Sequence, residues 1–247
     1  HRRRHSFPTR RSSDLMQFAS PLIYGVLLKR YKRFLADVRL DSGEELTVYC
    51  PNPGAMMGVT TPGLRVALTK SPIAGRKLIY TWEMVELNGV WIGVNTANPN
   101  LIVKEALTLG TINELSGYKN FKPEVKYGKN SRIDFLLSDG PTELCLVEVK
   151  NVHLIRHGTL AEFPDCVTAR GAKHQQELAE QVKNGIRCVV LYVVQRGDAE
   201  SFKVAEDLDP AYAKASEFST QAGVETIAYS CHMQTDGITL KQSLQVK

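Results

Sequence analysis

The sequence lacks any apolar run of about eighteen residues, the length at which a membrane-spanning helix becomes a candidate. It also lacks internal repeats and low-complexity segments. Hydrophobic residues still make up 43% of its 247 residues, which is enough for packed cores and comfortable for two domains. We therefore expect a globular protein of two domains that makes no use of a membrane.

Cysteine is sparse and shows no pairing pattern. The five cysteines are scattered, odd in number and mostly embedded in apolar runs, with no zinc spacing: Cys50, Cys145, Cys166, Cys188 and Cys231. They are typical of reduced core residues in a cytoplasmic protein. His153 and His157 lie four residues apart but have no third ligand at a recognisable spacing, so we expect no zinc site.

Little net charge remains once the first fifteen residues, HRRRHSFPTRRSSDL, are set aside, because they supply +4 of the formal +5. This tail is either a basic nucleic-acid-binding arm, a targeting segment without the usual apolar core, or translated adapter sequence joined upstream. We favour the third interpretation, so that residues 1–15 are a non-native or disordered tail and Met16 is the first native residue. The charge argument for nucleic acid then depends on local patches.

Residues 16–97 have the pattern of a small β-barrel. Short apolar runs are separated by turn residues, and Asn88-Gly89 between two of them is a strong hairpin signal. The expected strands are Leu22–Lys29, Phe34–Leu40, Glu45–Cys50, Leu64–Lys70, Leu78–Leu87 and Val90–Val94. Their number and length favour an OB-like barrel.

A basic and aromatic patch follows the first of these strands. Arg30, Tyr31, Lys32 and Arg33 are the candidate contacts to nucleic acid, because such barrels bind single strands by stacking within a basic groove. The alternative is a solvated edge strand that carries protective cations.

Residues 98–247 are predicted to form an α/β domain with a mixed sheet. We expect helices over 98–118, 168–184 and 210–222, and strands over 124–126, 187–194 and 224–230. At its centre two apolar runs, Ile133–Leu137 and Leu144–Val149, flank a Ser-Asp-Gly-Pro-Thr turn and predict a hairpin.

The hairpin brings three charged residues together. A turn at Gly140 or Pro141 places Asp134 opposite Val147 or Glu148, and Lys150 shares a face with Glu148. Two carboxylates suit Mg²⁺ or Mn²⁺, and the spacing of Asp134, Glu148 and Lys150 resembles the PD-(D/E)xK nuclease signature. A buried ion pair without metal is the alternative. On the next helix Arg170, Lys173 and His174 are compatible with phosphate binding or with a solvated basic face.

Longer motifs identify a family. The segments SPLIYGVLLKRYKRFLADV, CPNPGAM, SGYKNFKPEVKYGKNSRIDFLL, VEVKNV and FPDCVTARGAKHQQEL resemble the sugar fermentation stimulation protein family, and the likeness runs from Ser20 to the C-terminus. It implies an OB-like N-terminal barrel, a PD-(D/E)xK nuclease-like C-terminal domain and DNA binding, with a role in regulating sugar catabolism.

The resemblance also implies roles for individual residues. Asp134 and Glu148 become metal carboxylates and Lys150 the catalytic lysine, with a further acid from either Glu114 or Glu124. The residues expected to approach phosphates are Arg132, Arg170, Lys173 and His174. The function we expect is a divalent-metal-dependent phosphodiesterase acting on DNA, with RNA as an alternative substrate. A non-catalytic DNA-binding regulator is the alternative function, and a homodimer is an open possibility.

Overall fold

The computed structural model describes residues 16–128 and 131–247. Our expectation for the tail, residues 1–15, lies outside the described residues. Within the described part of the chain, no helix combines the length and the apolar character needed to cross a membrane.

The N-terminal part is a closed barrel, as predicted. Its sheet has the order β3-β2-β1-β4-β5-β6, and a pairing of Tyr49 with Thr81 joins β3 to β5 and closes the barrel. The strands are β1 (Ile23–Tyr31), β2 (Leu35–Leu40), β3 (Glu45–Tyr49), β4 (Arg65–Lys70), β5 (Tyr80–Leu87) and β6 (Val90–Gly93). Inward-facing side chains such as Leu27, Trp82 and Ile92 are fully buried and fill the interior, as alternating strands of a small barrel require.

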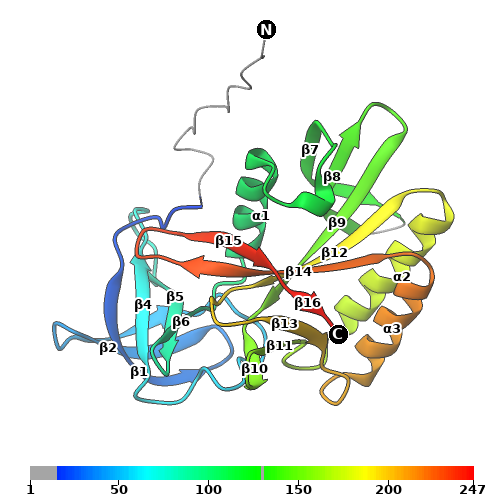
Figure 1. Ribbon diagram of the computed structural model, residues 1–247. Coiled ribbons are helices and arrows are strands. Elements are labelled where there is room, and N and C mark those ends of the chain that lie inside the picture. The colour runs from blue at the N-terminus through cyan, green and yellow to red at the C-terminus, as the bar shows by residue number, and fades with distance from the viewer. Residues whose placement is uncertain (1–15, 129–130) are drawn as a thin grey trace, which may run out of the picture.

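The C-terminal part is built on a mixed sheet of order β15-β14-β12-β9-β8-β7. Its strands are β7 (Asn120–Tyr127), β8 (Ser131–Asp139), β9 (Glu143–Val152), β12 (Arg187–Val194), β14 (Glu225–Met233) and β15 (Ile238–Ser243). The central β12 runs parallel to β9 and β14, whereas the outer pairings are antiparallel. This confirms the predicted α/β architecture, and we call this part the α/β region (Figure 1).

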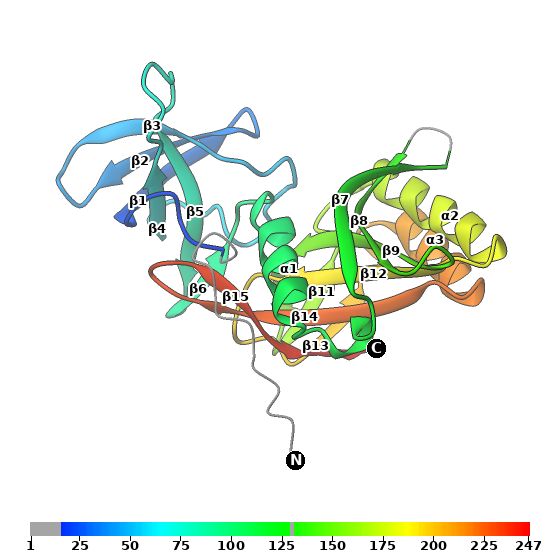
Figure 2. The ribbon, with the colours of Figure 1, turned by 90° about the horizontal axis from the view of Figure 1, so that it is seen from above.

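Helices cover both faces of the mixed sheet. On one face α1 (Asn98–Leu109) packs against Phe135, Val147 and Leu191. On the other face α2 (Ala169–Lys183) packs against Leu146 and Val190 beside α3 (Pro210–Gln221). Figure 2 shows α1 between the barrel and the β7–β8 hairpin, with α2 and α3 on the far side.

The predicted first helix, 98–118, is too long. It ends at Leu109 because Gly110 adopts a left-handed conformation with φ of 65°, and its N–H caps the carbonyls of the last turn. A short 3₁₀ helix, η2 (Asn113–Leu115), follows. Gly110 therefore terminates the helix eight residues before the end of the predicted range.

A second, small sheet was not predicted. It has the order β10-β11-β13-β16, and its strands are β10 (Leu154–His157), β11 (Leu160–Phe163), β13 (Ser201–Val204) and β16 (Gln245–Val246). Strands of two to four residues carry too few positions to show a period of two. This sheet matters for the site because β11 leads directly into the segment before α2.

The barrel and the α/β region are joined by direct contacts. The Met56 N–H donates to Oδ2 of Asp165 at 2.7 Å, and the Gly93 N–H donates to the Gln195 carbonyl at 2.7 Å. A Cβ atom on Gly54 would lie 2.9 Å from both carboxylate oxygens of Asp165, closer than real Cβ atoms approach. The barrel loop therefore rests on the connection between β11 and α2 with no room for a side chain at position 54.

Candidate metal centre and nucleic-acid interface

The hairpin of β8 and β9 brings Asp134 and Glu148 together. The register pairs Phe135 with Val147, so one residue further along the same register Asp134 lies opposite Glu148. Of the two registers the sequence allowed, the structure has this one. The Val149 N–H donates to Oδ2 of Asp134 at 2.7 Å, which fixes the carboxylate against the neighbouring strand.

Asp134 has a second fixed partner on α1, which lies on the opposite face of the sheet from α2. Asn100, in the first turn of α1, donates from Nδ2 to Oδ1 of Asp134 at 2.8 Å. Burial and the nearby negative charge of Glu148 nevertheless raise the pKa of Asp134 above its ordinary value. Two carboxylates therefore repel each other here, and a cation between them would relieve the repulsion.

Glu148 is nearly inaccessible, with 3% of its surface exposed. Its Oε1 accepts a hydrogen bond from Lys150 Nζ at 2.7 Å and a short one from His174 Nδ1. Burial alone would raise the pKa of Glu148, but His174 and Lys150 together outweigh it and lower the pKa. Oε2 of the same carboxylate is buried and has no hydrogen-bond partner among the described residues.

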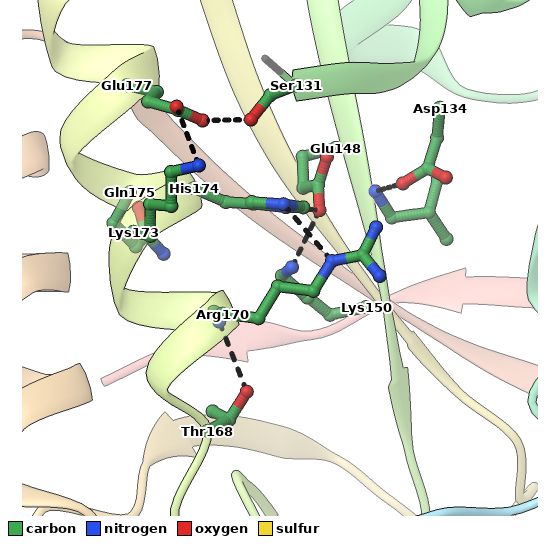
Figure 3. A network of polar contacts seen from close by, with 12 residues as sticks. Ser131, Asp134, Glu148, Lys150, Thr168, Arg170, Lys173, His174, Gln175 and Glu177 are labelled. Carbon is green, nitrogen blue, oxygen red and sulfur yellow. Dashed lines mark hydrogen bonds and ion pairs between the residues drawn. The ribbon is translucent and has the colours of Figure 1, made fainter.

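Helix α2 supplies the cationic wall of the site (Figure 3). Thr168 caps the helix by accepting a hydrogen bond from the Gly171 N–H, which orients the first turn. Arg170 and His174 lie one turn apart, and Arg170 Nε donates to His174 Nε2 at 3.4 Å. The imidazole hydrogen is therefore on Nδ1, facing Glu148. Lys173 is exposed and pairs with Glu177 at 3.4 Å.

These side chains surround a cavity of about 390 Å³, which we call the carboxylate cavity. It is lined by Glu124, Ser131, Arg132, Asp134, Glu148, Arg170, Lys173 and His174. Seven residues that the sequence analysis selected, from Glu124 to His174, thus line one polar cavity.

Glu124 occupies an irregular position at the rim. The β7–β8 ladder pairs Pro123 with Phe135 and Val125 with Ile133 but omits Glu124 and Asp134. At that position Glu124 has a φ of 54°, a conformation that costs a non-glycine residue about 1–3 kcal/mol and is concentrated at functional sites.

Glu114, the other acid considered for the metal, lies elsewhere. It belongs to η2, and its Oε2 accepts a hydrogen bond of 2.6 Å from the Tyr229 hydroxyl. It does not line the carboxylate cavity. The sequence could not separate the two glutamates, because only the fold shows that Glu124, on β7, lines the carboxylate cavity whereas Glu114 does not.

The barrel patch divides into two pairs. Arg30 is used internally: its guanidinium donates to the carbonyls of Asn52, Gly54 and Ala55 and so holds the barrel loop. The Tyr31 hydroxyl donates to Asp37 at 3.0 Å. Arg30 and Tyr31 are thus held by contacts within the barrel, and nucleic-acid contact by all four residues stays a prediction. Lys32 and Arg33 form the exposed turn between β1 and β2.

A second cavity, of about 440 Å³, lies between the barrel and the α/β region, and we call it the seam cavity. Residues from both parts line it, among them Arg33, Asn52, Gly54, His153, Asp165 and Arg170. His153 is buried in this lining, while His157 is exposed. Local sequence patterns could not indicate this cavity, since its walls come from five separate segments.

The ligand chemistry of the carboxylate cavity is that of a hard cation site with few protein ligands. Among residues 16–128 and 131–247, no three His, Cys, Asp or Glu side chains converge as a complete metal-binding group. Mg²⁺ commonly binds through one or two carboxylates and keeps several waters or substrate phosphates. Oε2 of Glu148, for which residues 16–128 and 131–247 supply no hydrogen-bond partner, fits that mode of binding together with the Asp134 carboxylate.

Comparisons with known proteins agree with one another. Residues 97–237 match the model of the sugar fermentation stimulation protein RE domain, and residues 28–94 match that of the SfsA N-terminal OB domain. Curated sugar fermentation stimulation protein homologs include one from Rhodospirillum centenum, 51% identical and covering 94% of this chain and 99% of its own. Another, from Maricaulis maris, is 50% identical and covers 94% and 99%.

A solved structure shares the whole fold. It is that of Pyrococcus furiosus SfsA in complex with Ca²⁺, 27% identical in sequence, with a TM-score of 0.84 over 94% of this chain and 99% of that one. The likeness therefore extends over both the barrel and the α/β region.

Proposed function

The chain belongs to the sugar fermentation stimulation protein family, and we propose that it binds DNA and hydrolyses phosphodiester bonds with Mg²⁺ or Mn²⁺ held by Asp134 and Glu148. The observation that carries this proposal is the buried Oε2 of Glu148, which has no hydrogen-bond partner in the part of the chain that the structure describes and lies beside a second carboxylate of raised pKa. A buried charged oxygen without a partner is costly unless a ligand completes it. The Ca²⁺ of the related Pyrococcus furiosus structure supports a divalent cation in this family.

The cation, when bound, supplies Lewis-acid activation of a phosphoryl oxygen and helps to generate a nucleophile at neutral pH. Asp134 and Glu148 would hold it, with Glu124 at the rim as the third acid. Because Val149 and Asn100 fix Asp134 while His174 and Lys150 fix Glu148, neither carboxylate has to reorganise in order to bind.

Lys150 has the clearest catalytic role among the cations. Its side chain is 12% exposed, and Nζ rests on Oε1 of Glu148, at the edge of the cavity. From there the ammonium stabilises negative charge that develops on a phosphate. His174 acts as a positioning residue through Glu148, whereas Arg132, Arg170 and Lys173 are placed to contact backbone phosphates.

The barrel contributes binding. Lys32 and Arg33 project from an exposed turn, and Arg33 lines the seam cavity together with Arg170 of the α/β region. A strand that follows these cations reaches the carboxylate cavity, because Arg170 lines both hollows. DNA is the proposed partner and RNA the alternative. The free, mostly buried cysteines support a cytoplasmic location.

One observation favours a second candidate, a non-catalytic DNA-binding regulator of sugar catabolism. Oε1 of Glu148 is already paired with Lys150 and His174, so the carboxylate is largely neutralised without metal. In that case the three residues form a structural ion-pair network.

Nuclease assays separate the two candidates. Wild type and Asp134→Ala are incubated with single-stranded and duplex DNA and with RNA, in Mg²⁺, Mn²⁺ or EDTA. If the protein is a nuclease, we expect wild type to cleave nucleic acid only when metal is present, and we expect Asp134→Ala to lose this cleavage. Retained DNA binding without cleavage of any substrate by wild type would favour the regulator.

A further inference from the structure

The seam cavity adjoins the proposed metal centre but is not part of it. Arg170, at the start of α2, is the residue that lines both the seam cavity and the carboxylate cavity. A strand of nucleic acid that runs from the barrel turn along Arg170 to Asp134 and Glu148 passes the seam cavity. What this cavity can bind depends on the residues that line it.

His153 is an unusual residue in that lining. It is 4% exposed, and neither ring nitrogen has a hydrogen-bond partner among the described residues. The nearest charged oxygen, Oδ2 of Asp165, is 3.5 Å from Nε2 and already accepts the Met56 N–H. A buried imidazole without a partner costs about 1–3 kcal/mol unless a ligand accepts its hydrogen.

The charge around the cavity favours an anion. Arg33 enters from the barrel and Arg170 from α2, and both are exposed. Glu162, one of the two acids in the lining, is neutralised by Arg156 at 2.7 Å and by Lys203 at 3.3 Å. Asp165, the other acid, accepts a hydrogen bond from the Met56 N–H. Helix α2 begins at the cavity with no acidic residue in its first turn, and a helix N-terminus attracts anions.

We propose that the seam cavity is a phosphate-binding pocket, in which His153, Arg33 and Arg170 hold a backbone phosphate of the strand whose next segment lies at Asp134 and Glu148. The pocket deepens the proposed function and rests on it for the identity of the strand. Its chemistry, a buried neutral donor between two arginines, fits a phosphate group whether it belongs to a polynucleotide or is free in solution.

Binding of labelled single-stranded DNA to the full chain in EDTA, where no metal-dependent cleavage occurs, tests the pocket by fluorescence anisotropy. Arg33→Gln and His153→Leu should each weaken affinity about tenfold, the effect of one lost hydrogen bond to a charged group. Arg33→Gln should also lower the log–log salt slope by roughly 0.7. Lys104→Gln, an exposed cation of α1 that lines neither cavity, is the control and should leave affinity unchanged.

Thermal melting keeps the His153→Leu result interpretable. Because the substitution removes two unsatisfied polar atoms, the melting temperature should stay the same or rise while affinity falls. If His153→Leu does not fold, the surface variant Arg33→Gln decides alone. Unchanged affinity in both folded variants would overturn the pocket.

Calorimetry with inorganic phosphate separates the pocket from the proposed function. Phosphate binding by wild type that His153→Leu abolishes, together with no DNA binding, would sustain the pocket for a free phosphate and sink the nucleic-acid function. DNA binding that neither variant weakens would sustain the nucleic-acid function and reject the phosphate pocket. DNA binding that both variants weaken, without cleavage in Mg²⁺, would sustain the pocket and reject only the hydrolytic activity.

Discussion

Asn100 on α1 donates a hydrogen bond of 2.8 Å from Nδ2 to Oδ1 of Asp134, which links the first helix after the barrel to the proposed metal centre. Loss of a group that orients a metal ligand commonly lowers metal affinity 10–100-fold. We expect Asn100→Leu to weaken Mg²⁺ or Mn²⁺ binding by about tenfold or more in a thermal-shift titration. Lys104→Gln on the same helix is the control, and equal midpoints in the two variants would show that Asn100 does not position the ligand.

Asp134→Asn should stabilise the metal-free protein. Burial and Glu148 raise the pKa of Asp134, so its ionised form opposes folding at pH values above its ordinary 3.8. The amide removes that charge and keeps a group of similar size. Thermal melts in EDTA should therefore show an equal or higher melting temperature, and added Mg²⁺ should no longer raise it as it does in wild type. A large loss of stability in EDTA would instead indicate a structural ion pair.

Lys150→Met distinguishes the enzyme from the ion-pair network by a different route. If a cation sits at Glu148, the variant should retain the metal-dependent rise in melting temperature but lose DNA cleavage, measured as the rate of product formation on a gel. If Lys150 only neutralises Glu148, its removal leaves a buried charge poorly paired and costs about 3–5 kcal/mol in urea unfolding. Full stability together with full activity would contradict both interpretations.

The pH dependence of stability should reveal how much the charge of Glu148 contributes to the free energy of unfolding. His174 and Lys150 hold the pKa of Glu148 below its ordinary 4.5, so its contribution to stability is present above that value. The contribution is lost as pH falls through the lower folded-state pKa. Urea unfolding of wild type and Glu148→Gln from pH 7 downwards should show a gap in stability that narrows below about pH 4.5. A gap that does not change with pH would mean that the charge of Glu148 contributes nothing.

The exposed turn between β1 and β2 should contribute to DNA affinity through its charge but should not contribute to the stability of the fold. Replacing Lys32 and Arg33 together by glutamine should reduce DNA affinity and lower the log–log salt slope by roughly 0.7 for each lost contact to a single strand. The melting temperature should hardly change, because both side chains are exposed. Arg30→Gln is the informative comparison: it should destabilise the barrel loop, whose carbonyls Arg30 holds. An unchanged slope in the double variant would place the nucleic-acid surface elsewhere.

Much of the fold follows from local patterns in the sequence. The Asn88-Gly89 turn, the apolar run of β12 and the Thr168 cap of α2 each specify their element through nearby residues alone. The strands of the small second sheet do not, because each is too short to display a period and because β13 pairs with two strands that are distant in the sequence, β11 and β16.

The site was predictable where its residues share one hairpin. Asp134, Glu148 and Lys150 lie on β8 and β9, so strand alternation and a turn were enough to bring them together. Local sequence could not indicate that Arg30 donates its hydrogen bonds to the loop carbonyls or that Glu114 accepts a hydrogen bond from Tyr229, since these contacts are long-range. The role of His153 depends on the meeting of the barrel with the α/β region, which no single segment encodes.

The close approach of Gly54 to Asp165 makes the junction sensitive to the smallest possible addition. A methyl group at position 54 would lie 2.9 Å from both carboxylate oxygens of Asp165, so in Gly54→Ala that carboxylate has to move away from the barrel loop and from the Met56 N–H that it accepts. The segment before α2 carries Asp165 four residues before Ala169, where the helix of Arg170 and His174 begins. One added carbon would thus disrupt a contact that ties the barrel loop to the segment before α2, without changing the charge of either part.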